Sequence, residues 1–501
     1  MRFDATIVYS ALGTMSTNAL RKIICRLVLA AILITAVCFT ISNASAQQTD
    51  IEIRLLSENQ SVAIEMNAAP ASSWSFVDSY AGIVGLGRRV ERFAAFDESG
   101  SEVPVRQSAP GQFRSDKIAT RLRYEVDLHP VSRAAGFSMI SWLDTDHGVL
   151  MPLDLLPTVT GSSGVRKVVF RLPASWVVQS GELKVSQNEF AISDAGRAVF
   201  AVGANLRSSQ TNVSGLRLSF VTNGEWAFSD ADAIDLSQQV LKAHRETFRM
   251  FPGKTATFIL FPFPSAVSAT QWSAETRGAT VTLIMGKLPS RVAALAQLST
   301  PVTHEFFHLW IPNALPLEGN YDWFYEGFTT YEAAQATVKL GLLSFPQFLD
   351  SIARAYEASK SETSLSLIEA SSRRFTGGGN SVYAKSQVVA FLYDLRLRGA
   401  SHGKRSLADV YRRLMRSAAP AKDGSELVSS VLSEEIGSED FVGSFVRRAV
   451  SINLVKELEP FGLIVDTSGV RARISVSERL NKQQRDLLRE LGYNAATHAA
   501  R

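Results

Sequence analysis

The stretch His304-Glu305-Phe306-Phe307-His308 decides how this 501-residue chain is interpreted. It has the pattern H-E-x-x-H, and histidines four residues apart lie on one face of an α-helix, close enough to share one metal ion. Glu326 follows 18 positions after His308. A carboxylate from a second helix can complete the protein ligands of a catalytic zinc site and leave the fourth position to water. The pattern predicts one zinc ion per chain, held by His304, His308 and Glu326. The alternative is a chance match, which seven histidines in the whole chain make improbable.

The helix that carries the two histidines is expected to run from about Pro301 to Trp310. Thr300-Pro301 is typical of a helix start, because the N–H that proline lacks would be unsatisfied there in any case. Pro312 disfavours helical conformation at the residue before it, so the helix should end soon after His308.

A second helix is expected from Trp323 to Leu340. Asp322 is a suitable N-cap residue, and Gly341 is suitable just past the C-terminal end. Glu326 would then lie in the first turn, where its carboxylate can approach a metal ion held by the other helix.

Glu305 lies on the same helix as the histidines but is not placed as their partner ligand. It is expected to act as a general base, taking a proton from the attacking water and passing it to the leaving amine. The alternative is a solvated helix glutamate without a role. Together these residues favour a zinc hydrolase, in the first place a peptidase.

The segments 304–310 (HEFFHLW) and 323–329 (WFYEGFT) resemble the glycyl aminopeptidase family of gluzincin zinc peptidases. Members of this family have a thermolysin-like catalytic domain and often carry a C-terminal PDZ domain. The same motifs are related more distantly to the large alanyl aminopeptidase family. The resemblance is strong from about Pro301 to Tyr331 and weak over most of the remaining mature chain. It implies an aminopeptidase that acts on peptides.

The segment Val382-Tyr383-Ala384-Lys385-Ser386 resembles the Y-x-K-G signature of related aminopeptidases, with Ser386 in place of the glycine. That signature supplies a tyrosine to the oxyanion, so the resemblance implies this role for Tyr383. Tyr383 is expected in the first turn of a helix that runs to about Arg398, where the partial positive charge of the helix N-terminus favours a nearby oxyanion. The alternative is a core tyrosine on an amphipathic helix.

Glu275 is the candidate for recognising the free α-amine of a substrate. It matches the acidic residue of the family's G-G-L-E-H type segment, but Trp272 and Ser273 stand in place of the glycines and Thr276 replaces the histidine. These departures leave open both the preference for a free N-terminus and the preference for small residues such as glycine or alanine. The alternative is an ordinary surface carboxylate.

Residues 1–46 have the pattern of a signal peptide. A basic segment containing Arg21 and Lys22 precedes the apolar run Leu27–Ile41, and Ala44-Ser45-Ala46 predicts cleavage after Ala46. Either Met1 or Met15 could be the initiator. The expected location is periplasmic or secreted, without stable membrane association. An uncleaved membrane anchor is the alternative, although the apolar run is short for a span.

Both cysteines of the chain lie inside this segment. The mature protein would therefore have neither a disulfide nor a thiolate ligand, which leaves histidine and carboxylate to bind zinc.

The mature chain is expected to be a multi-domain α+β protein. Alternating strand-like runs predict an all-β domain over residues 47–225. A thermolysin-like zinc catalytic domain follows at 226–344, then a helical domain at 345–456 that carries Tyr383. A short extension covers 457–501 and predicts a hairpin and a helix, too little for a full PDZ domain.

The leading functional prediction is an exported zinc aminopeptidase whose partner is a peptide. A zinc endopeptidase or other amide hydrolase with the same site is the first alternative. An inactive peptide-binding homologue is the second, and the intact set of ligands and base argues against it. No basic patch indicates nucleic acid, and the oligomeric state is left open.

Overall fold

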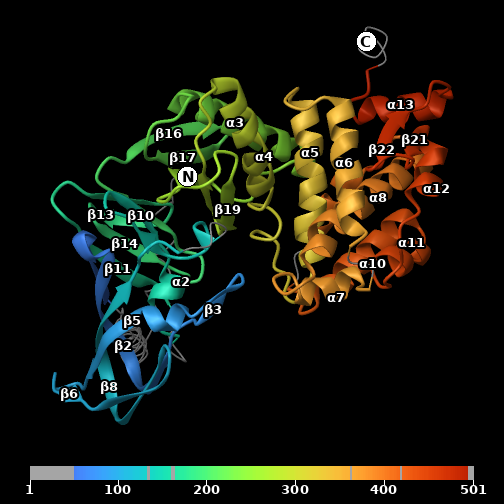
Figure 1. Cartoon of the computed structure of the whole chain (residues 1–501). Helices are drawn as coiled ribbons and strands as arrows, with labels where there is room; N and C mark the ends of the chain where they lie inside the picture. The colour runs from blue at the N-terminus through green and yellow to red at the C-terminus, as the bar shows by residue number, and fades with distance from the viewer. Residues whose placement is uncertain (1–49, 132–135, 159–163, 362–363, 418–419, 495–501) are drawn as a thin grey trace, which may run out of the picture.

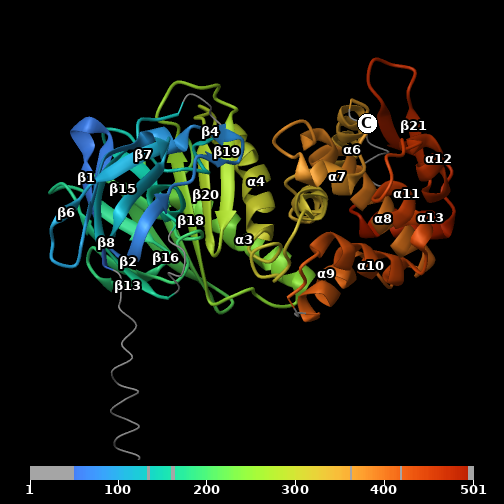
Figure 2. The same cartoon turned by 90° about the horizontal axis from the view of Figure 1, so that it is seen from below.

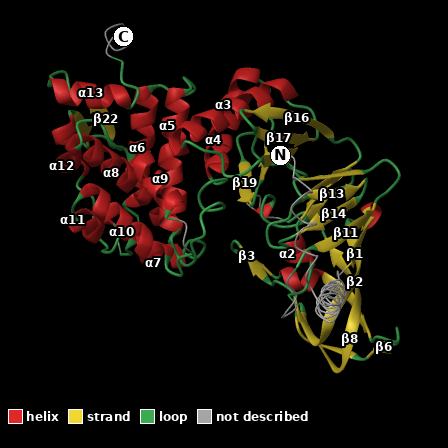
Figure 3. Cartoon of the chain, turned by 180° about the vertical axis from the view of Figure 1, so that it is seen from behind, coloured by secondary structure: helices red, strands yellow, loops and turns green. Residues whose placement is uncertain are grey.

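The β-strands and the α-helices gather in different parts of the molecule (Figures 1 and 3). The computed structural model describes residues 50–131, 136–158, 164–361, 364–417 and 420–494. The strands lie mainly in the N-terminal part of the chain and the helices in the C-terminal part, so the predicted multi-domain α+β architecture is confirmed. The predicted signal peptide, residues 1–46, lies outside the described residues. Within the described ranges, no helix is long and apolar enough to cross a membrane.

The N-terminal part is built from two sheets that pack face to face. The nine-stranded sheet has the order β13-β14-β11-β1-β2-β8-β5-β6, with β7 also paired to β8, and the four-stranded sheet has the order β12-β15-β10-β9. Side chains from both sheets fill one core, including Ile53, Tyr124 and Phe200. The strands are β1 (Asp50–Leu56), β2 (Ser61–Ser75), β5 (Val90–Phe96), β6 (Glu102–Val103), β7 (Val105–Ala109), β8 (Gln112–Asp127), β9 (Trp142–Leu143), β10 (His147–Leu150), β11 (Arg166–Arg171), β12 (Val177–Ser180), β13 (Leu183–Ser186), β14 (Glu189–Ile192) and β15 (Phe200–Gly203).

A third, five-stranded sheet lies between this sandwich and the helices. Its order is β16 (Arg207–Val213), β17 (Leu216–Thr222), β18 (Thr255–Pro262), β20 (Thr280–Met285) and β19 (Trp272–Arg277). Strand β18 reads as a continuous apolar run because both of its faces are buried. Phe258 and Leu260 pack with the helices, whereas Ile259 and Phe261 pack with the four-stranded sheet. The third sheet begins at β16, ahead of the boundary that we predicted at residue 225.

Helix α4 (Arg291–Phe307) packs beside α3 (Asp230–Phe248) on one face of the third sheet (Figure 2). The sequence placed its start at Pro301, which is wrong, because Pro301 lies inside the helix. The helix begins ten residues earlier, where the Ser290 hydroxyl caps the N–H of Ala293. A buried stripe at four-residue spacing, Ala294, Leu298, Val302 and Phe306, holds it on the sheet and outweighs the hydrogen bond that the proline removes.

The second helix of the site begins with a π-helical turn. Residues Trp323–Phe328 form this turn (η4), and α5 (Thr329–Lys339) continues it. Gly341 has the expected left-handed conformation just past the end, with φ +70°. Asp322 does not cap the helix as we predicted. Its carboxylate instead accepts a hydrogen bond from the Tyr325 hydroxyl at 2.7 Å.

A second π-helical turn, η5 (Ser381–Lys385), faces η4 and leads into α8 (Ser386–Ala400). Gly327 of η4 lies close to the start of α8, since an added Cβ would lie 2.2 Å from the Cβ of Ser386. The Ser386 hydroxyl donates a hydrogen bond to the backbone oxygen of Trp323 at 2.6 Å. The serine that replaces the glycine of the Y-x-K-G signature therefore joins the two turns.

Gly327→Ala is expected to destabilise the protein by about 3 kcal/mol, because the new methyl group would overlap Ser386 and the backbone oxygen of Val382. Denaturant unfolding of the two proteins measures this difference. Gly443→Ala, in the α-helix α11 (Glu439–Phe445) where an added Cβ meets no atom within 4 Å, is the matched control. It should be neutral or slightly stabilising. Equal stability of the wild type and Gly327→Ala would contradict the close approach.

The helices that follow α5 pack into one core with α3, α4 and the third sheet. The predicted C-terminal extension contains the expected hairpin and helix, and its side chains Leu463, Ile474 and Leu488 belong to this same core. The elements are α6 (Phe345–Ser359), α7 (Leu367–Ser372), α9 (Leu407–Arg416), α10 (Gly424–Ile436), α12 (Leu454–Leu458), β21 (Leu463–Asp466), β22 (Arg473–Val476) and α13 (Lys482–Glu490).

Candidate active site

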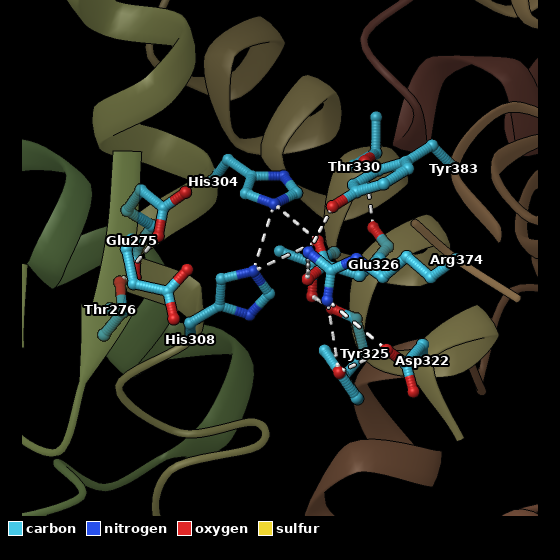
Figure 4. Close-up of polar contacts among 12 residues, drawn as sticks. Glu275, Thr276, His304, His308, Asp322, Tyr325, Glu326, Thr330, Arg374 and Tyr383 are labelled. Carbon is cyan, nitrogen blue, oxygen red and sulfur yellow. Dashed lines mark hydrogen bonds and ion pairs between the residues drawn. The ribbon is translucent and has the colours of Figure 1, made fainter. Parts of the chain in front are cut away.

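A cavity of about 560 Å³ lies where the third sheet and α4 face the helical part. All six residues singled out from the sequence line it: Glu275, His304, Glu305, His308, Glu326 and Tyr383. Glu275 and the two histidines lie on one wall, and Glu326 and Tyr383 on the other (Figure 4). The structure thus brings together residues from four separate segments of the chain.

His304, His308 and Glu326 turn three ligand atoms toward one point. The Nε2 atoms of the two histidines are 3.0 Å apart. Glu326 Oε2 lies 3.2 Å from Nε2 of His304 and 3.5 Å from Nε2 of His308. His308 Nδ1 lies 2.8 Å from the backbone oxygen of Ile311. This contact places the proton on Nδ1 and leaves the Nε2 lone pair facing the other ligands.

These spacings fit a zinc ion. Nitrogen and oxygen ligands about 2.0–2.1 Å from a tetrahedral ion lie roughly 3.3 Å from one another. All three observed separations fall close to that value. Two imidazoles and a carboxylate are also a ligand set found in catalytic zinc sites.

The electrostatics of Glu326 and His308 suit a cation. Burial alone would raise the pKa of Glu326, but Arg374 and His308 beside it hold that pKa well below the usual range. Burial lowers the pKa of His308, but the Glu326 carboxylate outweighs this effect and raises it to about 9. An ionised carboxylate that raises the proton affinity of an adjacent imidazole also attracts a metal ion.

Glu305 is held by the edge strand β19. The Thr276 hydroxyl lies 2.7 Å from Glu305 Oε2 and 2.9 Å from the Glu305 backbone oxygen. Glu305 has a carboxylate oxygen within 4.8 Å of the ligand nitrogens of both histidines, but Glu326 lies closer to them. Glu305 therefore lies beside the three predicted ligands, a position that suits the predicted role of general base.

Tyr383 lies in η5, in the first turn of the long helix, on the wall opposite the two histidines (Figure 4). Its hydroxyl oxygen accepts a hydrogen bond from Arg374. Burial and the nearby Glu326 carboxylate raise the pKa of Tyr383 well above its ordinary value. The phenol therefore keeps its hydrogen and can donate it to an oxyanion.

Glu275 lies on β19, and residues of the β3–β4 hairpin (Ser79–Tyr80 and Ile83–Val84) line the same cavity. The Tyr80 hydroxyl donates to Glu275 Oε1 at 3.2 Å, and Arg277 Nε lies 3.9 Å from the same oxygen. Burial raises the pKa of Glu275, and Arg277 opposes the shift. The side chain remains 22% exposed. Glu275 is thus a partly buried carboxyl group that faces the cavity, and not the ordinary surface residue of the alternative interpretation.

The architecture matches known zinc peptidases. The chain superposes on an aminopeptidase N family protein from Idiomarina loihiensis with a TM-score of 0.71, over 87% of this chain and 82% of that one, at 18% sequence identity. The chain has the fold of the M1 zinc metallopeptidases. An M1 zinc metallopeptidase from Deinococcus radiodurans gives a TM-score of 0.53 over 81% of this chain and 95% of that one, at 14% identity. No protein-family model matches the chain, and no curated protein matches its sequence.

Three further residues of this M1-like cleft were missed by the sequence interpretation. Arg374 contacts Glu326 and Tyr383, Tyr80 contacts Glu275, and Thr276 contacts Glu305. Arg374 and Tyr80 lie outside every recognised motif, and no local pattern marks them. Thr276 was noted only as a departure from a family pattern, although its position beside Glu275 was the available signal.

Proposed function

We propose that this chain is a zinc-dependent aminopeptidase that removes small N-terminal residues from peptides. The observation that carries the proposal is the position of Glu275. A carboxyl group with few protein partners lies in the same cavity as the predicted zinc ligands and the predicted base. A substrate ammonium group would give this carboxyl group a closer charged partner than Arg277, whose Nε lies at 3.9 Å.

His304, His308 and Glu326 would hold the zinc ion. When bound, zinc polarises the scissile carbonyl group and lowers the pKa of the attacking water. Within the glycyl aminopeptidase resemblance, the same three residues match the family's ligands. The M1 fold supports the assignment, and a variant of the Deinococcus enzyme was solved with a Tyr-Ser-Ala substrate.

Glu305 and Tyr383, beside the proposed zinc ligands, have separate roles in the reaction. Glu305 accepts the proton of the attacking water and delivers it to the leaving amine, with Thr276 fixing one oxygen of its carboxylate. Tyr383 donates its hydroxyl hydrogen to the oxyanion of the tetrahedral intermediate from the opposite wall. The base and the oxyanion donor therefore act on opposite sides of the scissile bond.

Tyr80, Met139 and Trp272 line the cavity near Glu275. These bulky side chains, in the same cavity as Glu275, support the removal of one small residue at a time. An endopeptidase would need that end of the cavity to be open for further residues of the substrate. We also propose export to the periplasm or the medium, with Gln47 as the first residue of the mature protein, which N-terminal sequencing tests.

Aminoacyl p-nitroanilides tested beside their N-acetylated forms distinguish the aminopeptidase from the endopeptidase or general amide hydrolase. The free substrates are expected to be cleaved and the blocked forms to be cleaved poorly. Glu275→Gln should lower kcat/KM for the free substrates roughly 10- to 100-fold, because a charged hydrogen bond to the ammonium group is lost. Glu318→Gln, on an exposed loop outside the cavity, should leave kcat/KM unchanged. Equal cleavage of free and blocked substrates would rule out the aminopeptidase.

A further inference from the structure

Arg374 lies in the loop between α7 and η5, on the helical wall of the cavity. Its side chain is only 13% exposed. Nη2 contacts Glu326 Oε1 at 2.8 Å and donates to the Tyr383 hydroxyl. Figure 4 shows the guanidinium group between these two side chains. One residue thus contacts both the predicted third zinc ligand and the predicted oxyanion donor.

The contact with Glu326 fixes the orientation of that carboxylate. Oε1 is occupied by Arg374, whereas Oε2 faces the two imidazoles at 3.2 and 3.5 Å. A carboxylate without this partner could rotate and exchange its two oxygens. Groups that orient metal ligands in this way contribute substantially to metal affinity.

The contact with Tyr383 fixes the direction of its hydroxyl hydrogen. A phenol has one hydrogen to donate, and an arginine can only donate. Because Arg374 donates to the hydroxyl oxygen, the hydrogen of Tyr383 must point elsewhere. Tyr325 shows the same pattern, since its hydroxyl accepts from Arg374 at 3.2 Å and donates to Asp322 at 2.7 Å.

A cavity-lining arginine could instead bind the carboxylate of a substrate. Its contacts do not support that role here. Nη2 already has Glu326 and Tyr383 as partners, and Nη1 has Tyr325 at 3.2 Å and Asp322 at 3.4 Å. Each terminal nitrogen carries two N–H groups, so both nitrogens have their full number of partners within the protein.

We propose that Arg374 is a positioning residue that sets the metal ligand Glu326 and the hydroxyl of Tyr383 at the same time. This inference rests on the proposed zinc-dependent function. It requires the planar, forked guanidinium group, because a lysine ammonium cannot hold four partners in these directions.

Zinc affinity and turnover, measured separately, test the proposal. Competition with a chromophoric chelator gives the zinc Kd without any substrate, and an aminoacyl p-nitroanilide gives kcat and KM. Arg374→Met is expected to weaken zinc binding 10- to 100-fold and to lower kcat at saturating zinc with little change in KM. Arg374→Lys keeps the positive charge and serves as the conservative variant in case Arg374→Met does not fold. It should also have a lower zinc affinity and a lower kcat. Arg373→Met, at the exposed neighbouring arginine, is the matched control and should change neither.

Tyr383→Phe separates the two contacts of Arg374. It should lower kcat and leave the zinc Kd unchanged. The double variant Arg374→Met/Tyr383→Phe should bind zinc as weakly as Arg374→Met does. Relative to Tyr383→Phe, its kcat should fall by a smaller factor than Arg374→Met lowers the wild-type kcat, because part of the effect of Arg374 acts through the missing hydroxyl. A zinc Kd and a kcat within twofold of the wild type in folded Arg374→Lys and Arg374→Met would overturn the proposal. If the wild type binds zinc but cleaves no aminoacyl substrate, the proposed activity fails while the zinc measurement still tests Arg374.

Discussion

Glu305→Gln is expected to lower kcat by about 10³-fold or more while the protein still binds zinc. Glutamine preserves the shape of the side chain and can keep the contact with Thr276, but an amide cannot accept and return the proton of the attacking water. The change lies beside the predicted ligands and not among them, so metal content should stay at the wild-type level. Metal analysis of the purified variant and single-substrate kinetics measure the two effects.

The buried Glu332 on α5 provides the matched control for this experiment. It lies outside the residues that line the cavity, and burial raises its pKa to about 7. Glu332→Gln should leave kcat unchanged. A Glu305→Gln enzyme that keeps more than a tenth of wild-type kcat would show that another group accepts the proton.

Glu326→Ala is expected to lose zinc, with affinity weakened by more than the roughly 100-fold typical of an outer-shell change. It also leaves the Arg374 guanidinium buried without its nearest carboxylate, which should cost about 3 kcal/mol of stability. Metal content after dialysis against a chelator, together with denaturant unfolding, measures both losses.

Asp322→Asn is the matched control for Glu326→Ala, because it removes the other carboxylate near Arg374 but no predicted ligand. It should keep zinc at close to wild-type affinity. Full zinc occupancy in Glu326→Ala would remove Glu326 from the ligand set.

Local sequence pattern was sufficient for much of the fold. Alternating strand-like runs predicted the β-rich N-terminal part, because burial on one face of a strand leaves a direct trace in the sequence. The predicted start of α4 was wrong because Pro301 is typical of a first helical turn. The buried stripe that begins at Ala294 sets the actual start ten residues earlier. Nothing local separates a π-helical turn such as η4 from an α-helical one.

In the candidate site, too, some residues could be predicted from local sequence pattern and others could not. His304, His308 and Glu326 follow a spacing that is set within two neighbouring helices. Tyr80 meets Glu275 across 195 positions of sequence, and Arg374 meets Glu326 only through the packing of α7, η4 and η5. Contacts of that kind depend on tertiary structure, so a single sequence carries no signal for them.

The two walls of the cavity come from opposite sides of one short connection. His304, Glu305 and His308 belong to the chain up to residue 308, and Glu326 and Tyr383 belong to the chain after residue 322. Neither portion holds a complete set of reacting groups. The apolar core that α4 shares with α5 and α8 packs the two portions against each other, so that both sets of groups face one cavity. Assembly of that core therefore brings the predicted ligands, the predicted base and the predicted oxyanion donor together. A substitution that loosened this core would separate these groups even where each portion kept its own secondary structure.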